Sequence, residues 1–128
     1  MPASRKGAFK VLLVDDDSLV RTTCARSLNA CGYTVTMAAD GEGAWERLRS
    51  EVFDLLITDH MMPRLTGLNL IKRLRDANMT VPSILISGNP PTDESDLLLL
   101  IQPGRFLQKP FNLASLLDVV NGLLKIPD

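Results

Sequence analysis

Phe9-Lys10-Val11-Leu12-Leu13-Val14 runs directly into three acids, Asp15-Asp16-Asp17, and this stretch is the clearest indication of the fold class. All of the first six residues except Lys10 are apolar, which is typical of a strand buried on both faces of a parallel sheet. Asp17 or Ser18 is suited to cap a following helix, in which apolar residues recur at helical spacing until Gly32. A buried strand that leads at once into an amphipathic helix predicts a βα unit.

The same alternation continues along the chain. Further strands are expected at 33–38, 53–58, 82–86 and 105–108, and Asp40-Gly41 is expected to form a turn. Further helices are expected at 43–50, at 68–77, from a cap at Thr92 or Asp93 to just before Pro103, and after a cap at Asn112. Five apolar strands that alternate with five helices predict an α/β fold, in which a parallel sheet is covered by helices on both faces.

Length and composition indicate one domain. The chain has 128 residues, of which 45% are hydrophobic and 23% are charged, as in an ordinary globular protein. We expect residues 1–7 to form a flexible N-terminal tail and residues 8–126 to form the domain. A net charge of −1 gives no basic field for nucleic acid or for an anionic membrane surface. The longest apolar run, residues 97–101, is too short to cross a membrane, and the N-terminus lacks the apolar stretch of a signal peptide.

The two cysteines, Cys24 and Cys31, fall on the same predicted helix. A separation of seven residues places their Cα atoms about 10 Å apart, beyond the ~7 Å limit for a disulfide. The single histidine is distant from both, so a zinc site is not expected. We therefore predict two reduced cysteines and a cytoplasmic protein.

Polar residues stand where the predicted strands end. Asp15 and Asp16 follow the first strand, Asp59 the third, Ser87 the fourth and Lys109 the fifth. The carboxyl ends of parallel strands face the same edge of a sheet, so we expect these side chains to converge. Carboxylates alone would repel one another, which favours a bound Mg²⁺ ion. A lysine and a hydroxyl beside that ion would complete a site for a phosphoryl group.

Four motifs in order resemble those of the receiver domain of two-component response regulators, a family that includes chemotaxis regulators. They are Val11-Leu12-Leu13-Val14-Asp15-Asp16-Asp17, Asp59-x-x-Met62-Pro63, Ser87-Gly88 and Lys109-Pro110-Phe111. The resemblance extends from the first strand to the last helix. It implies a flavodoxin-like sheet with the strand order 2-1-3-4-5.

The resemblance also implies the roles of the acids. Asp59 would accept a phosphoryl group from the phosphohistidine of a histidine kinase or a histidine phosphotransfer protein. Asp16 and Asp59 would bind Mg²⁺ directly, Asp15 would assist through water, and the backbone carbonyl of Met61 would supply a further ligand. His60, the only histidine, is expected to be an exposed loop residue and not a catalytic base.

The remaining motif residues would bind the phosphoryl group or take part in the conformational change that follows phosphorylation. Lys109 would pair with one phosphoryl oxygen, and Ser87 would donate to another. Phe106 matches the aromatic residue that turns inward as Ser87 moves, and Lys109-Pro110 would be a cis peptide. The family often has Asp-Gly where this chain has Thr66-Gly67, so the turn glycine is kept and no metal ligand is lost.

The predicted fourth helix contains five consecutive apolar residues, Leu97-Leu98-Leu99-Leu100-Ile101. Five successive side chains point to all sides of a helix, so some of them should face outward. Together with Phe106 they are interpreted as a face for a downstream protein partner. A phosphorylation-dependent dimer is also left open. Residues 105–111 resemble receivers attached to hybrid histidine kinases, so both a stand-alone protein and a piece of a hybrid kinase are open.

Two other functions compete with this one. In a haloacid-dehalogenase-type phosphohydrolase Asp15 would be the nucleophile, but Asp59 would then have no role and the acidic pair required after Lys109 is missing. In a flavin-binding module the first loop would have to cradle a phosphate, which the acids at that position would repel. The sequence therefore favours a switch that catalyses only its own phosphorylation and dephosphorylation, and not a free-standing enzyme.

Overall fold

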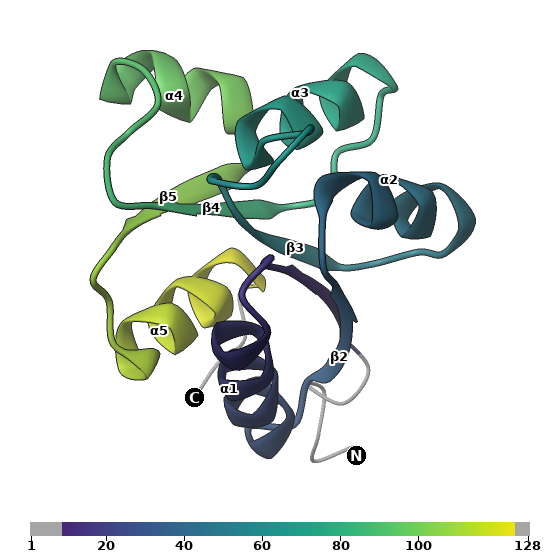
Figure 1. Ribbon diagram of the computed structural model, residues 1–128, viewed down its shortest axis with the longest axis vertical. Helices are drawn as coiled ribbons and strands as arrows, with labels where there is room; N and C mark the ends of the chain where they lie inside the picture. The colour runs from purple at the N-terminus through teal and green to yellow at the C-terminus, as the bar shows by residue number, and fades with distance from the viewer. Residues whose placement is uncertain (1–8, 125–128) are drawn as a thin grey trace.

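A computed structural model of the chain describes residues 9–124. Five parallel strands form one sheet in the order β2-β1-β3-β4-β5 (Figure 1). The strands are β1 (Lys10–Val14), β2 (Thr34–Ala38), β3 (Leu55–Asp59), β4 (Ser83–Ser87) and β5 (Gly104–Gln108). The helices are α1 (Ser18–Ala30), α2 (Gly41–Ser50), α3 (Gly67–Asp76), α4 (Glu94–Ile101) and α5 (Leu113–Leu124). The predicted fold class and strand order are confirmed.

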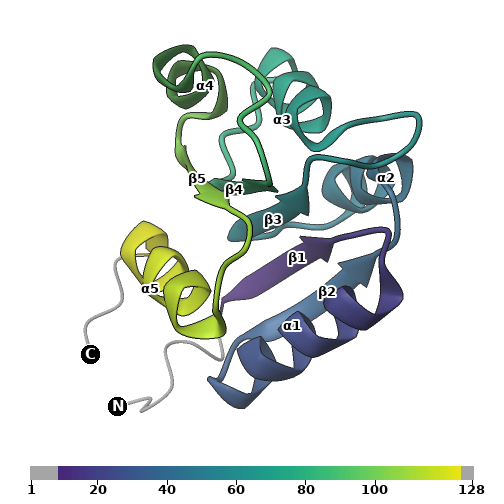
Figure 2. The same ribbon diagram turned by 60° about the vertical axis from the view of Figure 1, so that its left-hand side comes forward.

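The helices form two layers, one on each face of the sheet. Figure 2 shows α1 and α5 on one side, with α2, α3 and α4 on the other. The side chains of β1 alternate between the two layers: Val11 and Leu13 pack toward α1 and α5, while Leu12 and Val14 pack toward α2, α3 and α4. Because both faces of β1 are covered, its four buried residues, 11–14, are all apolar.

The start of α2 differs from the prediction. Asp40-Gly41 is not a separate turn, because Asp40 is the N-cap of a helix that begins at Gly41. Its carboxylate accepts a hydrogen bond from the Gly43 N–H at 2.7 Å. The predicted caps of α1 and α5 are found, since Asp17 accepts from the N–H groups of Leu19 and Val20, and Asn112 accepts from that of Ser115.

The leucine run of α4 is divided between core and surface. Leu97 and Ile101 are fully buried, so the expectation that they belong to a partner face is wrong. They lie four residues apart and therefore face the same way, toward the core shared with α3. Leu98, Leu99 and Leu100 are exposed and remain on the outer side of the helix.

Arg75 of α3 fixes the C-terminal end of α4. Its guanidinium donates to the carbonyl oxygens of Ile101 at 2.9 Å, Gln102 at 2.7 Å and Pro103 at 3.1 Å. Burial lowers the pKa of this group, yet a guanidinium keeps its charge in proteins. The carbonyl of Ile101, the last residue of α4, and that of the C-cap Gln102 have no partner within the helix and are satisfied in this way.

Both cysteines are free, as predicted, and Cys24 is buried. No helix within residues 9–124 has the length and apolar character needed to cross a membrane. The expected flexible tail, residues 1–7, and the last residues of the expected domain lie outside the described residues.

Candidate functional site

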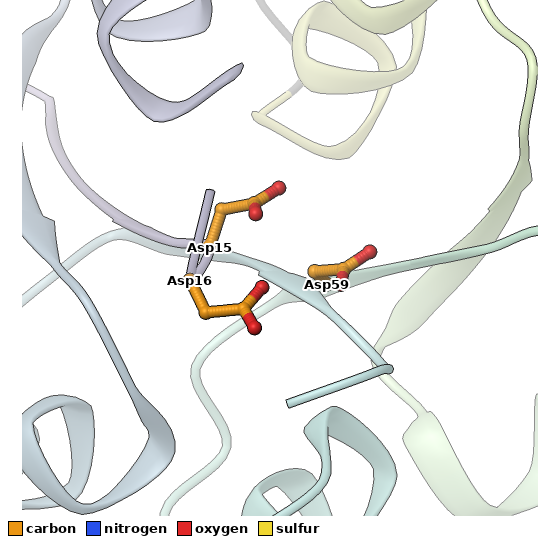
Figure 3. Close-up of side chains that lie close together, drawn as sticks. All are labelled: Asp15, Asp16 and Asp59. Carbon is orange, nitrogen blue, oxygen red and sulfur yellow. The ribbon is translucent and has the colours of Figure 1, made fainter. Parts of the chain in front are cut away.

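Three carboxylates meet at the carboxyl ends of two neighbouring strands. Asp15 and Asp16 directly follow β1, and Asp59 is the last residue of β3, which pairs with β1. One carboxylate oxygen from each residue lies within 4.8 Å of the others, and the side chains of Asp15 and Asp16 extend toward Asp59 (Figure 3). Asp15 and Asp59 are buried and Asp16 is exposed. The predicted convergence of these acids is therefore present in the structure.

The carboxylate of Asp15 is partly held by its own loop. Its Oδ1 accepts a hydrogen bond from the Asp17 N–H at 2.9 Å. The pKa of Asp15 is raised, chiefly because burial disfavours the charged form. The Asp17 N–H opposes this rise, and the negative charges of Asp59 and Asp16 add to it. A cation at this point would relieve the cost of holding Asp15 ionised.

Lys109, which follows β5, brings a positive charge to the acids. Its Nζ lies 2.7 Å from Asp59 Oδ1. The two groups form an ion pair, and no other described residue donates to Oδ1. Burial lowers the pKa of Lys109, but the contact with Asp59 and the charges of Asp15 and Asp16 outweigh it, so the net change is upward. Lys109 is therefore an ammonium ion at neutral pH.

Ser87 ends β4 next to this cluster, and its hydroxyl is engaged by its own loop. Ser87 Oγ donates to the Asn89 carbonyl at 2.7 Å and accepts from the Asn89 N–H at 3.4 Å. The Lys109 N–H donates to the Ser87 carbonyl at 2.9 Å, and Gln108 Nε2 donates to that of Gly88 at 3.1 Å. Lys109-Pro110 is a cis peptide, as the resemblance implied.

The loop between β3 and α3 folds back against Asp59. An added Cβ at Gly67 would lie 2.3 Å from the Asp59 carbonyl oxygen, so only glycine permits this approach. The N–H groups of Met62 and Gly67 both donate to the His60 carbonyl, at 3.0 and 3.1 Å. The prediction of an exposed His60 is wrong, because the side chain is half-buried and its Nδ1 accepts from the Leu68 N–H at 3.3 Å. Burial lowers the pKa of His60.

The donor set fits a hard divalent cation. Carboxylate and carbonyl oxygens are its preferred ligands. The acids offer three carboxylates, and the Lys109 ammonium is the one described partner of the buried Asp59 Oδ1. No donor to the Met61 carbonyl is found in the part of the chain that the structure describes. Phe106, the expected switch residue, is half-buried against the core on the α3 and α4 side of the sheet.

A comparison with protein families identifies the chain, since residues 11–121 match the model of the response regulator receiver domain. The chain belongs to this family. Response regulator MprA of Mycobacterium ulcerans is 38% identical to this receiver domain over 118 residues, which are 92% of this chain and 51% of that protein. The chain thus spans about half the length of the curated relatives it matches.

Solved structures agree with this assignment. The receiver domain of the hybrid histidine kinase CckA is 35% identical, with a TM-score of 0.75 over 90% of this chain and 98% of that chain. The response regulator TrrA of Thermotoga maritima, solved in complex with Mg²⁺ and BeF, is 26% identical, with a TM-score of 0.80 over 90% and 98% of the two chains. Nothing in these comparisons supports a haloacid-dehalogenase-type phosphohydrolase.

Two polar contacts of this receiver domain were not predicted. Gln108 holds the Ser87 loop through Gly88, and Arg21 holds the first acidic loop through the Asp15 carbonyl. Each is a hydrogen bond from a side chain to a backbone carbonyl oxygen, and the sequence does not show which carbonyl will be the acceptor. A basic residue so early in a helix is the one local signal that could have drawn attention to Arg21.

Proposed function

We propose that this receiver domain is a phosphorylation-controlled switch in which Asp59 accepts a phosphoryl group from a phosphohistidine. Receiver domains of response regulators work with kinases and downstream effectors, and they are signalling modules and not turnover enzymes. The observation that carries the proposal is the buried Asp59 carboxylate, which lies between two further acids and the Lys109 ammonium.

The proposed metal is Mg²⁺, and its ligands would be Asp16, Asp59 and the Met61 carbonyl, with Asp15 acting through water. When bound, Mg²⁺ would neutralise phosphoryl oxygens and orient the transferring group for attack. The structure of TrrA with Mg²⁺ and BeF supports this assignment by similarity.

In the proposed transfer an Asp59 carboxylate oxygen attacks phosphorus, the phosphorus–nitrogen bond breaks, and the imidazole of the donor leaves and takes a proton from solvent. Lys109 would move its ammonium from the carboxylate to a phosphoryl oxygen, a shift that needs little motion because it already lies beside Asp59. Water later attacks phosphorus and releases inorganic phosphate, which restores the carboxylate.

The proposed response begins at Ser87. To donate to a phosphoryl oxygen, its hydroxyl must leave the Asn89 carbonyl, which rearranges the loop that leads into α4. The Phe106 side chain, half-buried beside this helix, would follow. The exposed side chains of Leu98, Leu99 and Leu100 then form the proposed face for a downstream protein or for a phosphorylation-dependent dimer.

The test is incubation with acetyl phosphate and Mg²⁺, followed by intact mass measurement. The wild type should gain one phosphoryl group, and Asp59→Asn should gain none. Asp76→Asn, an exposed acid at the end of α3, is the matched control and should behave as the wild type. An equal gain by wild type and Asp59→Asn, or none by either, would refute the proposal.

A further inference from the structure

Arg21, the fourth residue of α1, reaches back to the acidic loop. Its Nη1 donates to the carbonyl oxygen of Asp15 at 2.6 Å, and its side chain is half-buried. A cation near the N-terminus of a helix is unfavourable, because the helix dipole is positive at that end. The first turn of α1 contains no acid, and the Asp17 carboxylate at the N-cap is already engaged with the N–H groups of Leu19 and Val20. A residue that breaks a local preference in this way calls for a compensating role.

The contact completes a set of bonds around the peptide that joins Asp15 to Asp16. The Asp15 N–H donates to the Ala38 carbonyl at 3.3 Å, and the Asp15 carboxylate accepts from the Asp17 N–H at 2.9 Å. The Asp17 carbonyl in turn accepts from the Arg21 N–H at 2.9 Å. Arg21 thus holds the loop at two points, one through its backbone and one through its guanidinium.

Asp16 depends most on this arrangement. Its side chain is exposed, and no hydrogen bond or ion pair to its carboxylate is found within residues 9–124. The backbone at Asp16 is therefore the main described restraint on where that carboxylate can reach. The Asp15 carbonyl, which Arg21 holds, belongs to the peptide immediately before Asp16.

We propose that Arg21 is a positioning residue for the metal site: its guanidinium holds the Asp15–Asp16 peptide so that Asp16 faces Asp59 before the cation binds. The inference rests on the proposed function and extends it to a residue outside the ligand set. Because the guanidinium binds a neutral carbonyl and pairs with no carboxylate among the described residues, the acid oxygens stay available to the cation.

An electrostatic role and a positioning role for Arg21 predict opposite changes in Mg²⁺ affinity when its side chain is removed. If only its charge mattered, removing Arg21 would strengthen cation binding, because like charges repel. If it positions Asp16, removing it weakens binding, and loss of an outer partner of a metal ligand typically weakens metal affinity by about tenfold or more. The sign of the change therefore separates the two roles.

The test is calorimetric titration with MgCl₂ alone. Arg21→Met should bind Mg²⁺ about tenfold more weakly than the wild type, and Arg21→Lys should lie between them, because an ammonium keeps the charge but lacks the planar fork. Arg26→Met removes the same charge from an exposed position on α1 and should bind Mg²⁺ as tightly as the wild type or slightly more tightly.

Amide hydrogen exchange of the metal-free proteins gives a second readout. Exchange of the Asp15 and Asp17 amides, which donate to the Ala38 carbonyl and the Asp15 carboxylate, should be faster in Arg21→Met, while exchange at Leu28, in the core of α1, should be unchanged. Equal or tighter Mg²⁺ binding by Arg21→Met would overturn the inference and leave the proposed function standing, and so would a loss of protection throughout α1. Failure of the wild type to bind Mg²⁺ would overturn both.

Discussion

Lys109 Nζ lies 2.7 Å from Asp59 Oδ1, although Asp59 ends β3 and Lys109 follows β5, two strands that are not neighbours in the sheet. β4 lies between β3 and β5, so the contact spans the carboxyl edge of three strands. One ammonium there faces a cluster of three carboxylates. The charge left uncompensated is what a divalent cation would neutralise, so we expect the stability of the domain to depend on that cation.

Replacement of Lys109 by methionine should expose this dependence. Without the ammonium, the buried Asp59 carboxylate has no compensating charge, and we expect the free energy of unfolding to fall by about 1–3 kcal/mol in the absence of Mg²⁺. Mg²⁺ should recover more stability in this variant than in the wild type. Urea unfolding with and without Mg²⁺ measures both quantities, with Lys72→Met on the exposed side of α3 as the control. Equal stability of wild type and Lys109→Met without Mg²⁺ would contradict this account.

Replacement of Asp16 by asparagine should have the opposite effect on the metal-free protein. It removes one of three mutually repelling carboxylates, so the melting temperature without Mg²⁺ should rise. The stabilisation that Mg²⁺ gives the wild type, which follows from binding to the folded state alone, should be lost. Thermal unfolding monitored by circular dichroism tests both points. A lower melting temperature in the metal-free variant would show that repulsion among the acids is not a significant cost.

The affinity for Mg²⁺ should depend on pH through Asp15. Its pKa is raised in the folded protein, mainly by burial, so the folded metal-free state holds this proton more tightly than the unfolded chain does. The raised pKa costs stability at neutral pH, and that cost disappears as the pH falls through the raised value. Cation binding requires the ionised form, so calorimetry should show weaker Mg²⁺ binding over the same pH range, with a proton released by the protein as the cation binds. An affinity that stays constant down to the ordinary pKa of an aspartate would count against this role for Asp15.

The two sides of α4 should respond differently to substitution. Leu97 is fully buried, and Leu97→Ala should lower the free energy of unfolding by about 2–5 kcal/mol. Leu99 is 77% exposed, and Leu99→Ala should change it by no more than about 0.5 kcal/mol. Chemical unfolding of both variants checks the division of the leucine run. Similar losses at the two positions would mean that Leu99 is also part of a packed surface.

The sequence predicted the sheet and the convergence of the acids because both depend on local patterns. A strand that is buried on both faces appears in the sequence as a short run of apolar residues, with no alternation between polar and apolar positions. Parallel strands then bring their carboxyl ends to one edge of the sheet. Asp15, Asp59, Ser87 and Lys109 could therefore be placed together before any coordinates were known.

The features that could not be predicted depend on which side of a helix faces the core and on hydrogen bonds to backbone carbonyl oxygens. Five consecutive apolar residues carry no period, so nothing in the run showed that Leu97 and Ile101 face inward. Asp40-Gly41 suits both a turn and a helix cap, and the Gly43 N–H settles the choice only once α2 is in place. The partner of the Arg21 side chain is a carbonyl oxygen, which every residue carries, so sequence alone could not identify it.

We propose that Asp59, and no other acid of the cluster, carries the phosphoryl group. After phosphorylation with acetyl phosphate and Mg²⁺, borohydride reduction converts the acyl phosphate to an alcohol, and peptide mass spectrometry then locates the modified residue. The account predicts homoserine at position 59 alone, and none when Mg²⁺ is withheld. Homoserine at position 15 or 16 would contradict it.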